Sequence, residues 1–582
     1  MSKRKVKLKL LPKIIIFLIF ILAFLLRIYG ITWDQGYHLH PDERFLTMVE
    51  TTIKLPSSFS QYLDTKNSPL NPYNYKEFQF FVYGTFPVFL VKYISTYINM
   101  SGYDQVYLVG RVISAFFDSL NIFGIYLLTK FLIKNNKNKF ILFLPSLLYA
   151  FCILPIQLSH FFTVDTFLSP MLLFTFILLA YWTIQKKNFF LYLSAILFGL
   201  ALSTKISAYL FSPIILLFFI YSFFSAKTRS QTLLSFLIFP LISLAVFRFF
   251  QPYAFVGITK FNPIFIDNMI YLKSLLTTRN VFYPPEIQWL SKTALVFPFS
   301  NILFWGLGLP ISFLFLFKIK KIHHPFIVFC ILFWVLLLLI NQGIQFTSTM
   351  RYFLPIYPFI FILVGLIIKD NLPNKLIYFL ISGHIIFSIL FLSIYTRPHS
   401  RVQASQWIYQ NIPADSKITN EYWDDPLPLN FSSRYFSDYK NNMLPLYDPD
   451  TNEKWNQLDP IIKNADYIIM SSNRLWGSIP QVPDKYPLTT KFYQELFDEK
   501  NNFKKVVEIN SYPGINLPFM KKCIYIGPTN FPYKDKKNTW FYIDNYCQYP
   551  GIFLRDDTAE EAFTVYDHPK VLIYKNLKNN EN

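Results

Sequence analysis

The chain has 582 residues, of which 53% are hydrophobic and 20% aromatic, while only 15% are charged. This composition excludes an ordinary soluble protein, a disordered chain, a coiled coil and collagen. The formal net charge of +20 would suggest nucleic acid in a soluble protein, but most of the surplus lies in short loops between apolar runs and so indicates membrane topology. The sequence predicts a polytopic α-helical membrane protein that does not bind nucleic acid.

The first apolar run covers residues 14–33 and is long enough to cross the hydrocarbon core of a bilayer. Several basic residues precede it, which places the N-terminus in the cytoplasm. A cleaved signal peptide is the alternative, but the run ends without a small-x-small cleavage site. We therefore expect an uncleaved anchor.

Further apolar runs bring the expected number of spans to about eleven. They lie near 107–133, 140–157, 165–184, 189–204, 207–225, 231–250, 300–318, 325–342, 351–368 and 375–395. The segment 78–98 is interrupted by Gly84 and Pro87 and is either a twelfth span or an interfacial helix.

Lysine and arginine concentrate in alternate loops, for example at Lys186 and Lys187, which the positive-inside rule assigns to the cytoplasm. The long loops 34–106 and 251–299 and the tail 398–582 then face outward. We expect a multi-pass protein of the plasma or inner membrane with an extracytoplasmic active site, divided into a transmembrane domain 1–397 and a soluble domain 398–582.

The tail holds 23 of the chain's 35 carboxylates and no run long enough to span a membrane. Its patterns predict a small α/β domain. The expected elements are helices over 403–410 and 489–497, strands over 466–470 and 504–509, and a hairpin of 563–565 with 571–574 that turns at 567–569.

Four cysteines are present, and none has the spacing of a metal site. Cys152 and Cys330 lie inside apolar runs and are expected to be packing residues. Cys523 and Cys547 would face an oxidising exterior, where they form either a disulfide or two free thiols.

Adjacent carboxylates, Asp42 and Glu43, follow the first span directly. Pro41 favours a helix start, which would keep both carboxylates ionised at the positive end of the helix dipole and let one act as a general base. Helix capping with headgroup contacts is the alternative. Asp165 stands at the start of another span, where a carboxylate beside hydrocarbon needs a reason.

Five cations lie at or near the outer ends of spans, against the inward bias of the other basic residues. They are Arg27, Arg111, Lys205, Arg248 and Arg351. A lipid phosphate would explain them, because guanidinium and ammonium groups bind phosphate through charge-assisted hydrogen bonds. Snorkelling to headgroups is the alternative, as is pairing of Arg111 with Asp118 two helical turns away.

Three histidines, His38, His40 and His160, could join Asp42 and Asp165 around a divalent cation. Such a site needs three or more ligands that converge, and spacing alone does not show convergence. A divalent cation is therefore an open alternative, and no other cofactor is implied.

Short motifs along nearly the whole chain resemble the C superfamily of membrane glycosyltransferases, in particular bacterial relatives of the dolichyl-phosphate-mannose protein mannosyltransferases and the lipid A aminoarabinose transferases. The motifs are HPDE at 40–43, SHFFTVDT at 159–166, GLALSTK at 199–205, FQPYAF at 250–255, YPPEIQW at 283–289, MRYFLPIYP at 350–358, RPHSRVQASQWIY at 397–409, EYWDDPLPL at 421–429 and TVYDHPKV at 564–571. The stretch 519–550 departs from the pattern as an insertion.

The resemblance implies an inverting, mannosyltransferase-like enzyme of the cell envelope that moves a sugar from a polyprenyl-phosphate carrier to an acceptor hydroxyl, as in protein O-glycosylation. By position, Asp42 is the expected base, Glu43 orients the acceptor or replaces Asp42, and Asp165 holds sugar or acceptor. The implied substrate-binding residues are Lys205 and Arg351 at the phosphate, Arg111 and Arg248 more weakly, and His160 and Tyr352.

Two other classes of function compete with this one. A transporter or flippase of polyprenyl-linked lipids would also want cations in the outer leaflet, but no internal repeat is visible and the appended domain is unnecessary for transport. A membrane-anchored binding protein would leave the carboxylates and cations of the spans unexplained. The sugar and the class of acceptor, whether protein, lipid or glycan, stay open.

Overall fold

The computed structural model describes residues 2–133, 139–225, 229–279, 282–320, 322–371, 373–529, 539–545, 547 and 549–578. The chain packs into two compact units. The first comprises Met1–Ile31, Pro41–Thr277 and Ile302–Ser388, and the second comprises Thr32–His40, Thr278–Asn301 and Ile389–Asn582. This division follows packing, and the predicted boundary between residues 397 and 398 stays a prediction.

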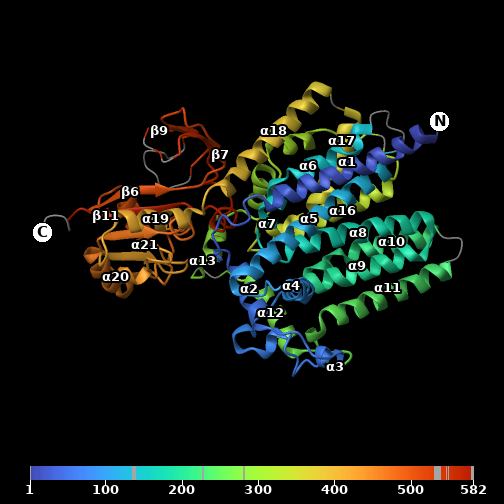
Figure 1. Cartoon of the computed structure of the whole chain (residues 1–582), viewed down its shortest axis with the longest axis horizontal. Helices are drawn as coiled ribbons and strands as arrows, with labels where there is room; N and C mark the ends of the chain where they lie inside the picture. The colour runs from blue at the N-terminus through green and yellow to red at the C-terminus, as the bar shows by residue number, and fades with distance from the viewer. Residues whose placement is uncertain are drawn as a thin grey trace. The chain divides into compact units, whose positions relative to one another are not determined.

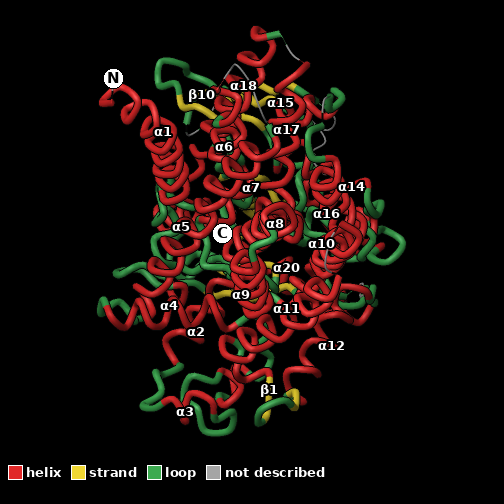
Figure 2. Tube along the Cα trace, turned by 90° about the vertical axis from the view of Figure 1, so that its right-hand side faces the viewer, coloured by secondary structure: helices red, strands yellow, loops and turns green. Residues whose placement is uncertain are grey.

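Long helices dominate the first unit (Figures 1 and 2). They are α1 (Ser2–Ile28), α5 (Tyr103–Leu132), α8 (Asp165–Gln185), α9 (Asn188–Thr204), α10 (Ser212–Ser225), α11 (Arg229–Phe250), α16 (Pro325–Gly343), α17 (Tyr357–Asn371) and α18 (Asn374–Leu392). In the described residues, eight helical segments are long and apolar enough to cross a membrane, or nine with one bent pair. The predicted class, a polytopic helical membrane protein, is confirmed.

Helix α11 shows why these segments suit lipid. Its leucines Leu233, Leu237 and Leu241 are all exposed, although they would be buried in a soluble protein. The opposite side of α11 packs on α9, and α9 packs on α8 (Figure 1). The helices therefore bury one another on one face and offer an apolar face to hydrocarbon on the other.

Two of the predicted spans are broken into several helices, and a third, 189–204, forms one helix that is short. Residues 140–157 contain η3 (Lys139–Leu142), α6 (Leu144–Ala150) and α7 (Ile153–Ser159), and α9 has 17 residues. The stretch 300–318 belongs to a helix pair that bends by 114°. Gly308 at this bend has a φ of +83°, which β-carbon sterics disfavour for other residues. The total of about eleven spans stays a prediction.

The first long loop of the chain folds over the ends of the spans. Its helices are α2 (Pro41–Thr52), α3 (Phe59–Leu63), η1 (Pro72–Asn74), η2 (Lys76–Phe78) and α4 (Thr85–Tyr97), and the second long loop adds η5 (Pro252–Ala254), the pair β1 (Phe255–Val256) and β2 (Lys260–Phe261), and α12 (Pro263–Thr277). Buried residues of both loops, including Leu46 and Tyr253, share one core with Phe162 and Phe167. With 13 residues, α4 is about 20 Å long at 1.5 Å per residue, too short for a twelfth span.

The second unit is an α/β domain, as the tail composition predicts. Its main sheet has the order β4-β3-β5-β11-β6, formed by β3 (Lys417–Glu421), β4 (Lys440–Leu444), β5 (Tyr467–Met470), β6 (Phe503–Ile509) and β11 (Val571–Asn576). Strand β3 pairs in parallel with β4 and β5, whereas β11 runs antiparallel to β5 and β6.

Alternate side chains of this sheet fill two separate cores. Ile468 and Met470 face one core with α20 (Asn452–Asn464) and α21 (Pro487–Phe497). Tyr467 and Ile469 face the other core with α19 (Ser400–Asn411). This is the two-residue period expected of a strand buried on both faces.

One predicted element of this domain is wrong. Residues 563–565 lie in the helix α22 (Glu561–Val565) and not in a hairpin strand, and β11 pairs with β5 and β6 instead. Side chains far away in sequence favour the helix, because Gln288 Oε1 accepts a hydrogen bond from the Glu561 N–H at 3.2 Å and Asn301 Oδ1 from the Glu560 N–H at 2.7 Å. Partners so distant give no local signal.

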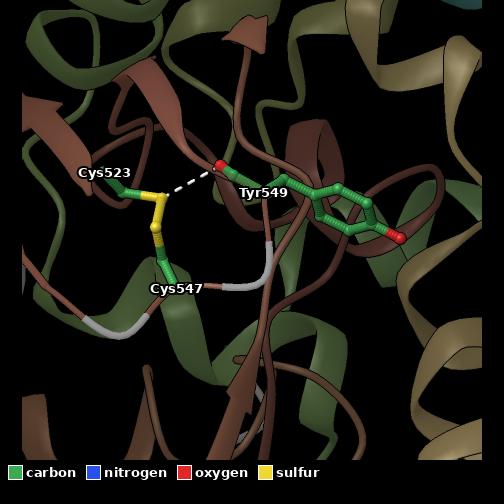
Figure 3. Close-up of a disulfide and its surroundings, with 3 residues drawn as sticks. All are labelled: Cys523, Cys547 and Tyr549. Atoms are coloured by element: carbon green, nitrogen blue, oxygen red, sulfur yellow. Dashed lines mark hydrogen bonds between the residues drawn. A yellow bond between two sulfur atoms is a disulfide. The ribbon is translucent and has the colours of Figure 1, made fainter. Parts of the chain in front are cut away.

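A smaller sheet has the order β7-β10-β8-β9 and consists of β7 (Gly514–Asn516), β8 (Cys523–Ile526), β9 (Phe541–Asp544) and β10 (Gly551–Leu554). Cys523 and Cys547 form a disulfide beside this sheet, and the Tyr549 carbonyl lies 3.0 Å from the Cys523 sulfur (Figure 3). Of the two alternatives that the sequence left open, the structure has the disulfide, which ties together the ends of most of the inserted stretch.

Candidate active site

Helix α2 begins at Pro41 and carries Asp42 and Glu43 in its first turn, as predicted. Asp42 forms an ion pair with Arg351, which lies in η9 (Met350–Ile356). Tyr83 also hydrogen-bonds Asp42. Burial raises the pKa of Tyr83 well above its usual range, and the charge of Asp42 adds to this, so the phenol stays a hydrogen-bond donor at neutral pH.

Glu43, the neighbouring residue, lies in a different environment. Its carboxylate is fully buried and accepts two hydrogen bonds from Arg111, from Nε at 2.8 Å and Nη2 at 2.6 Å. The Phe162 N–H adds a third at 2.8 Å. Arg111 also donates to the Ile31 carbonyl and lies over the Tyr107 ring. Glu43 therefore links α2 to α5 and to the loop before α8.

The second carboxylate, Asp165, is in the first turn of α8 and forms a 2.7 Å ion pair with Lys205 Nζ. Lys205 follows the last residue of α9. The loop before α4 packs directly on this helix end, where the Gly84 N–H donates to the Thr204 carbonyl at 3.1 Å. A β-carbon on Gly84 would lie 2.1 Å from the Ser203 carbonyl oxygen, so only glycine permits this approach.

Tyr352 connects the two ion pairs. The Lys205 ammonium lies 4.7 Å from the centre of its ring, and the Arg351 guanidinium lies 5.5 Å from it. Asp42, Arg351, Tyr352, Lys205 and Asp165 thus form one continuous row of contacts, which we call the polar row.

Exposure distinguishes the polar row from the other ion pairs of the first unit. The side chains of Lys205 and Arg351 are each 24% exposed, and that of Asp42 is 21% exposed. These cations can exchange their carboxylate partners for an anionic ligand, because neither charge is sealed from solvent. Two cations on one aromatic ring, with two carboxylates beside them, can bind a phosphate and accept a proton.

Other predicted site residues have different partners. Arg248 donates to the main-chain carbonyls of Gly257 at 2.6 Å and Pro252 at 3.2 Å, so its hydrogen bonds brace the β1–β2 turn. The ring nitrogens of His160 lie 2.8 and 2.9 Å from the main-chain oxygens of Ile156 and Tyr29.

The predicted alternative of a divalent cation requires at least three ligands close together. Within the part of the chain that the structure describes, no group of three or more His, Cys, Asp or Glu side chains converges. His40 lies instead against the Tyr566 ring in the second unit.

One predicted alternative is wrong. Asp118 does not pair with Arg111 but with Arg27, at 2.6 Å and fully buried. Tyr149 and Asn121 complete the shell of Asp118. A helix brings residues four apart together, but Arg111 and Asp118 are seven apart, and each found a closer partner on another helix.

Sequence reasoning missed Tyr83. It is one of 39 tyrosines and lies in a loop without periodicity, so its residue type gives no signal. The neighbouring Gly84 was noted only as an interruption of an apolar run, whereas its close contact with α9 is what brings this loop to the polar row.

No protein-family model and no curated protein matches the chain. Among solved structures, ArnT from Cupriavidus metallidurans bound to undecaprenyl phosphate is similar, with a TM-score of 0.45 and 10% identity over 80% of this chain and 94% of that chain. The archaeal oligosaccharyltransferase AglB from Archaeoglobus fulgidus, in complex with an inhibitory peptide and a dolichol-phosphate, has a TM-score of 0.41 and 12% identity over 83% and 72%.

The TM-scores below 0.5 and the low identities of these matches support no statement about the reaction of this chain. A function for the protein therefore has to be inferred from the geometry of the polar row.

Proposed function

We propose that the protein is an inverting glycosyltransferase that moves a sugar from a polyprenyl-phosphate carrier to an acceptor hydroxyl at the outer face of the membrane. The observation that carries this proposal is the polar row: two partly exposed cations beside two carboxylates, at the ends of apolar helices. A lipid phosphate needs the cations and the apolar surroundings together.

The proposed reaction uses each group once. Asp42 accepts the proton of the acceptor hydroxyl, whose oxygen attacks the anomeric carbon of the sugar. The bond between that carbon and the phosphate oxygen breaks, and the carrier leaves with the electron pair as polyprenyl phosphate. Lys205 and Arg351 stabilise the charge that develops on the phosphate. Because the attack displaces the phosphate in one step, the anomeric configuration inverts.

The ion pairs suggest how donor binding prepares the site. In the structure, Arg351 pairs with Asp42 and Lys205 pairs with Asp165. A donor phosphate would compete for both cations, which leaves the Asp42 carboxylate available to the acceptor hydroxyl. Asp165 would then be available to the sugar hydroxyls, as the resemblance implies.

Glu43 receives a different role in this proposal. All of its described contacts are inside the protein, so it positions α2 and Arg111 and is not the base. Arg111 and Arg248 also keep internal partners and are not proposed to contact the phosphate. The ring nitrogens of His160 also have main-chain partners inside the protein, so His160 is not proposed to contact the donor.

Transfer from a defined donor tests the proposal. The purified protein is incubated in lipid nanodiscs with a radiolabelled sugar on polyprenyl phosphate, and free polyprenyl phosphate and labelled product are measured. Mannose is the first sugar to test, because the resemblance implies a mannosyltransferase-like enzyme. The proposal is wrong if the folded protein neither binds polyprenyl phosphate nor releases it. Donor that crosses the bilayer unchanged when the protein is placed in closed proteoliposomes would indicate transport instead.

The proposed orientation has its own test. Ser437 is exposed in the second unit, and Lys187 is exposed in a predicted cytoplasmic loop. A membrane-impermeant maleimide on intact cells should label Ser437→Cys and not Lys187→Cys. Background labelling should be low, because Cys152 and Cys330 are buried and the other two cysteines form the disulfide. The reverse pattern would invert the topology.

A further inference from the structure

The second unit contains a polar cavity of about 210 Å³ that the polar row does not involve. Its walls come from four separate segments of that unit: the region of η6 (Gln288–Ser291), the stretch from Asn473 to Gln481, Asn510 and Tyr512 just after β6, and the connection from Asp556 to Lys570 between β10 and β11. Every lining residue lies in the described part of the chain.

Buried, hydrogen-bonded residues form part of the cavity walls. His568 is fully buried, with Nε2 2.7 Å from Asp556 and Nδ1 against Asp567. Helix α22 is fixed by the side chains of Gln288 and Asn301, which accept hydrogen bonds from the N–H groups at its start. The shape of the cavity is therefore set by buried side chains and not by exposed loops.

Glu561 lines the cavity with a buried carboxyl group. Its side chain is only 4% exposed, and within the described residues neither oxygen accepts a hydrogen bond, although Arg474 Nη1 lies 3.0 Å from Oε1. Burial raises the pKa of Glu561 to about 8, against the opposing charge of Arg474. The raised pKa favours the protonated form of this carboxyl group, which donates as well as accepts hydrogen bonds, and its ion-pair partner is Arg474.

The charges around the cavity nearly cancel. Burial lowers the pKa of His568, but Asp567 and Asp556 outweigh it and bring the value to about 10, so this histidine is charged beside Asp556. Lys570 neutralises Asp557 at 2.6 Å. Burial lowers the pKa of Lys292, whose Nζ is 2.9 Å from Gln481 Oε1. The lining therefore has no strong preference for an anion or a cation.

The remaining chemistry suits a polyhydroxylated ring. Side-chain amides of Gln288, Asn473 and Gln481 lie in the walls beside the Glu561 carboxyl. Their hydrogen bonds to Glu561, Thr564 and Gly477 fix their orientation, and amides held in this way can share their remaining N–H groups and lone pairs with the hydroxyls of a sugar. Trp476, whose side chain is mostly buried in the core of the second unit, supplies an apolar part of the wall for the C–H groups of a sugar. The cavity is below the roughly 300 Å³ at which sites for drug-sized ligands begin, so it fits a single ring.

We propose that this cavity binds one neutral sugar unit of a glycan. The site is lined by the second unit alone and does not depend on the function proposed for the polar row.

Ligand-observed saturation-transfer NMR on the purified full chain in detergent tests this. The probes are glucose, galactose, mannose and N-acetylglucosamine, with glucuronic acid and glucosamine as charged counterparts. We expect at least one neutral sugar to bind with a Kd on the order of millimolar and the charged counterparts to bind about tenfold more weakly.

Variants locate the binding. Glu561→Ala should weaken the sugar's affinity by about tenfold or more. Glu495→Ala is the matched control, because it removes a carboxylate of the same unit whose side chain is 43% exposed on α21, and it should change nothing. Asp42→Asn, which alters the polar row, should also leave this affinity unchanged, and a loss there would move the sugar to the polar row.

The proposal is overturned if the folded wild-type protein binds no neutral sugar at about 100 mM ligand, or if a charged counterpart binds more tightly. Glu561→Gln keeps the size, donor and acceptor of the protonated acid and should bind within about threefold of wild type. It replaces the alanine variant if that protein does not fold, and a tenfold loss in Glu561→Gln with native thermal unfolding would exclude the neutral carboxyl as the contact.

Discussion

Asp42 and Glu43 are neighbours on the first turn of α2, yet they belong to two different kinds of ion pair. Glu43 is sealed from solvent with Arg111, like Asp118 with Arg27. On the polar row, Asp42 and Arg351 are both partly exposed, and Lys205 is partly exposed although its partner Asp165 is buried. Because successive residues of a helix point in different directions, Glu43 faces the protein interior and adjacent Asp42 lies where a substrate can reach it.

The difference lies in what each carboxylate can exchange. A sealed pair cannot change partners without leaving a buried charge, so it contributes to the architecture. A partly exposed ion pair contributes little to the free energy of unfolding, so its cation can leave the carboxylate and bind a phosphate instead. Substitutions at the sealed pair should therefore lower stability, whereas substitutions at the exposed pair should lower turnover or donor affinity.

The largest effect is expected on stability at the sealed pair. Glu43→Gln leaves Arg111 buried without its countercharge and should cost about 3–5 kcal/mol, seen as a lower midpoint of thermal unfolding in a fixed detergent. Asp42→Asn is the matched control and should cost no more than about 1 kcal/mol. Equal midpoints for the two variants would contradict the distinction between the pairs.

The next effect is on turnover at the exposed pair. Asp42→Asn keeps the size of the side chain but removes its basicity, so turnover should fall about a hundredfold or more while donor binding stays nearly intact. Single-turnover transfer and donor binding are measured on the same preparation. If Glu43→Gln loses turnover while folded and Asp42→Asn retains it, the two roles are exchanged. If both remain active, Asp165 becomes the candidate base.

Donor affinity should respond to the cations of the polar row. Lys205→Gln and Arg351→Gln each lose a charge-assisted hydrogen bond, which should weaken polyprenyl-phosphate binding by about 1.5–3 kcal/mol. Titration calorimetry in nanodiscs measures this. Arg248→Gln is the matched control, because Arg248 donates to main-chain carbonyls, and it should bind the donor as wild type does. If both variants bind the donor as wild type does, Lys205 and Arg351 do not bind the donor phosphate and instead anchor the protein to lipid headgroups.

Local chemistry made part of this arrangement predictable. Pro41 and the two carboxylates mark a helix start in any context, and hydropathy indicates the long spans without knowledge of their partners. Motif position singled out nine residues. The structure brings five of them together as the polar row, namely Asp42, Asp165, Lys205, Arg351 and Tyr352, whereas Glu43, Arg111, Arg248 and His160 have other partners.

What could not be predicted depends on distant contacts. Nothing near Arg111 indicates that its partner is Glu43, 68 residues away, and the local candidate Asp118 was wrong. Tyr83 reaches Asp42 only because Gly84 permits a close approach to α9. The helix α22 likewise depends on tertiary packing, and the bend at Gly308 depends on a backbone conformation with positive φ. Hydrophobic periodicity predicts neither of them.

The smallest expected effect compares the aromatic rings beneath the two kinds of pair. Tyr352 lies under Lys205 and Arg351, and Tyr107 lies under the sealed Arg111. A cation–π contact at a partly exposed site contributes about 0.5–1 kcal/mol, so Tyr352→Ala should weaken donor binding about two- to fivefold, whereas Tyr352→Phe keeps the ring and should bind normally. Tyr107→Ala should lower the unfolding midpoint and leave donor affinity unchanged. If Tyr352→Phe binds the donor as weakly as Tyr352→Ala, the hydroxyl and not the ring acts on the donor, and the aromatic link between the two cations loses its function.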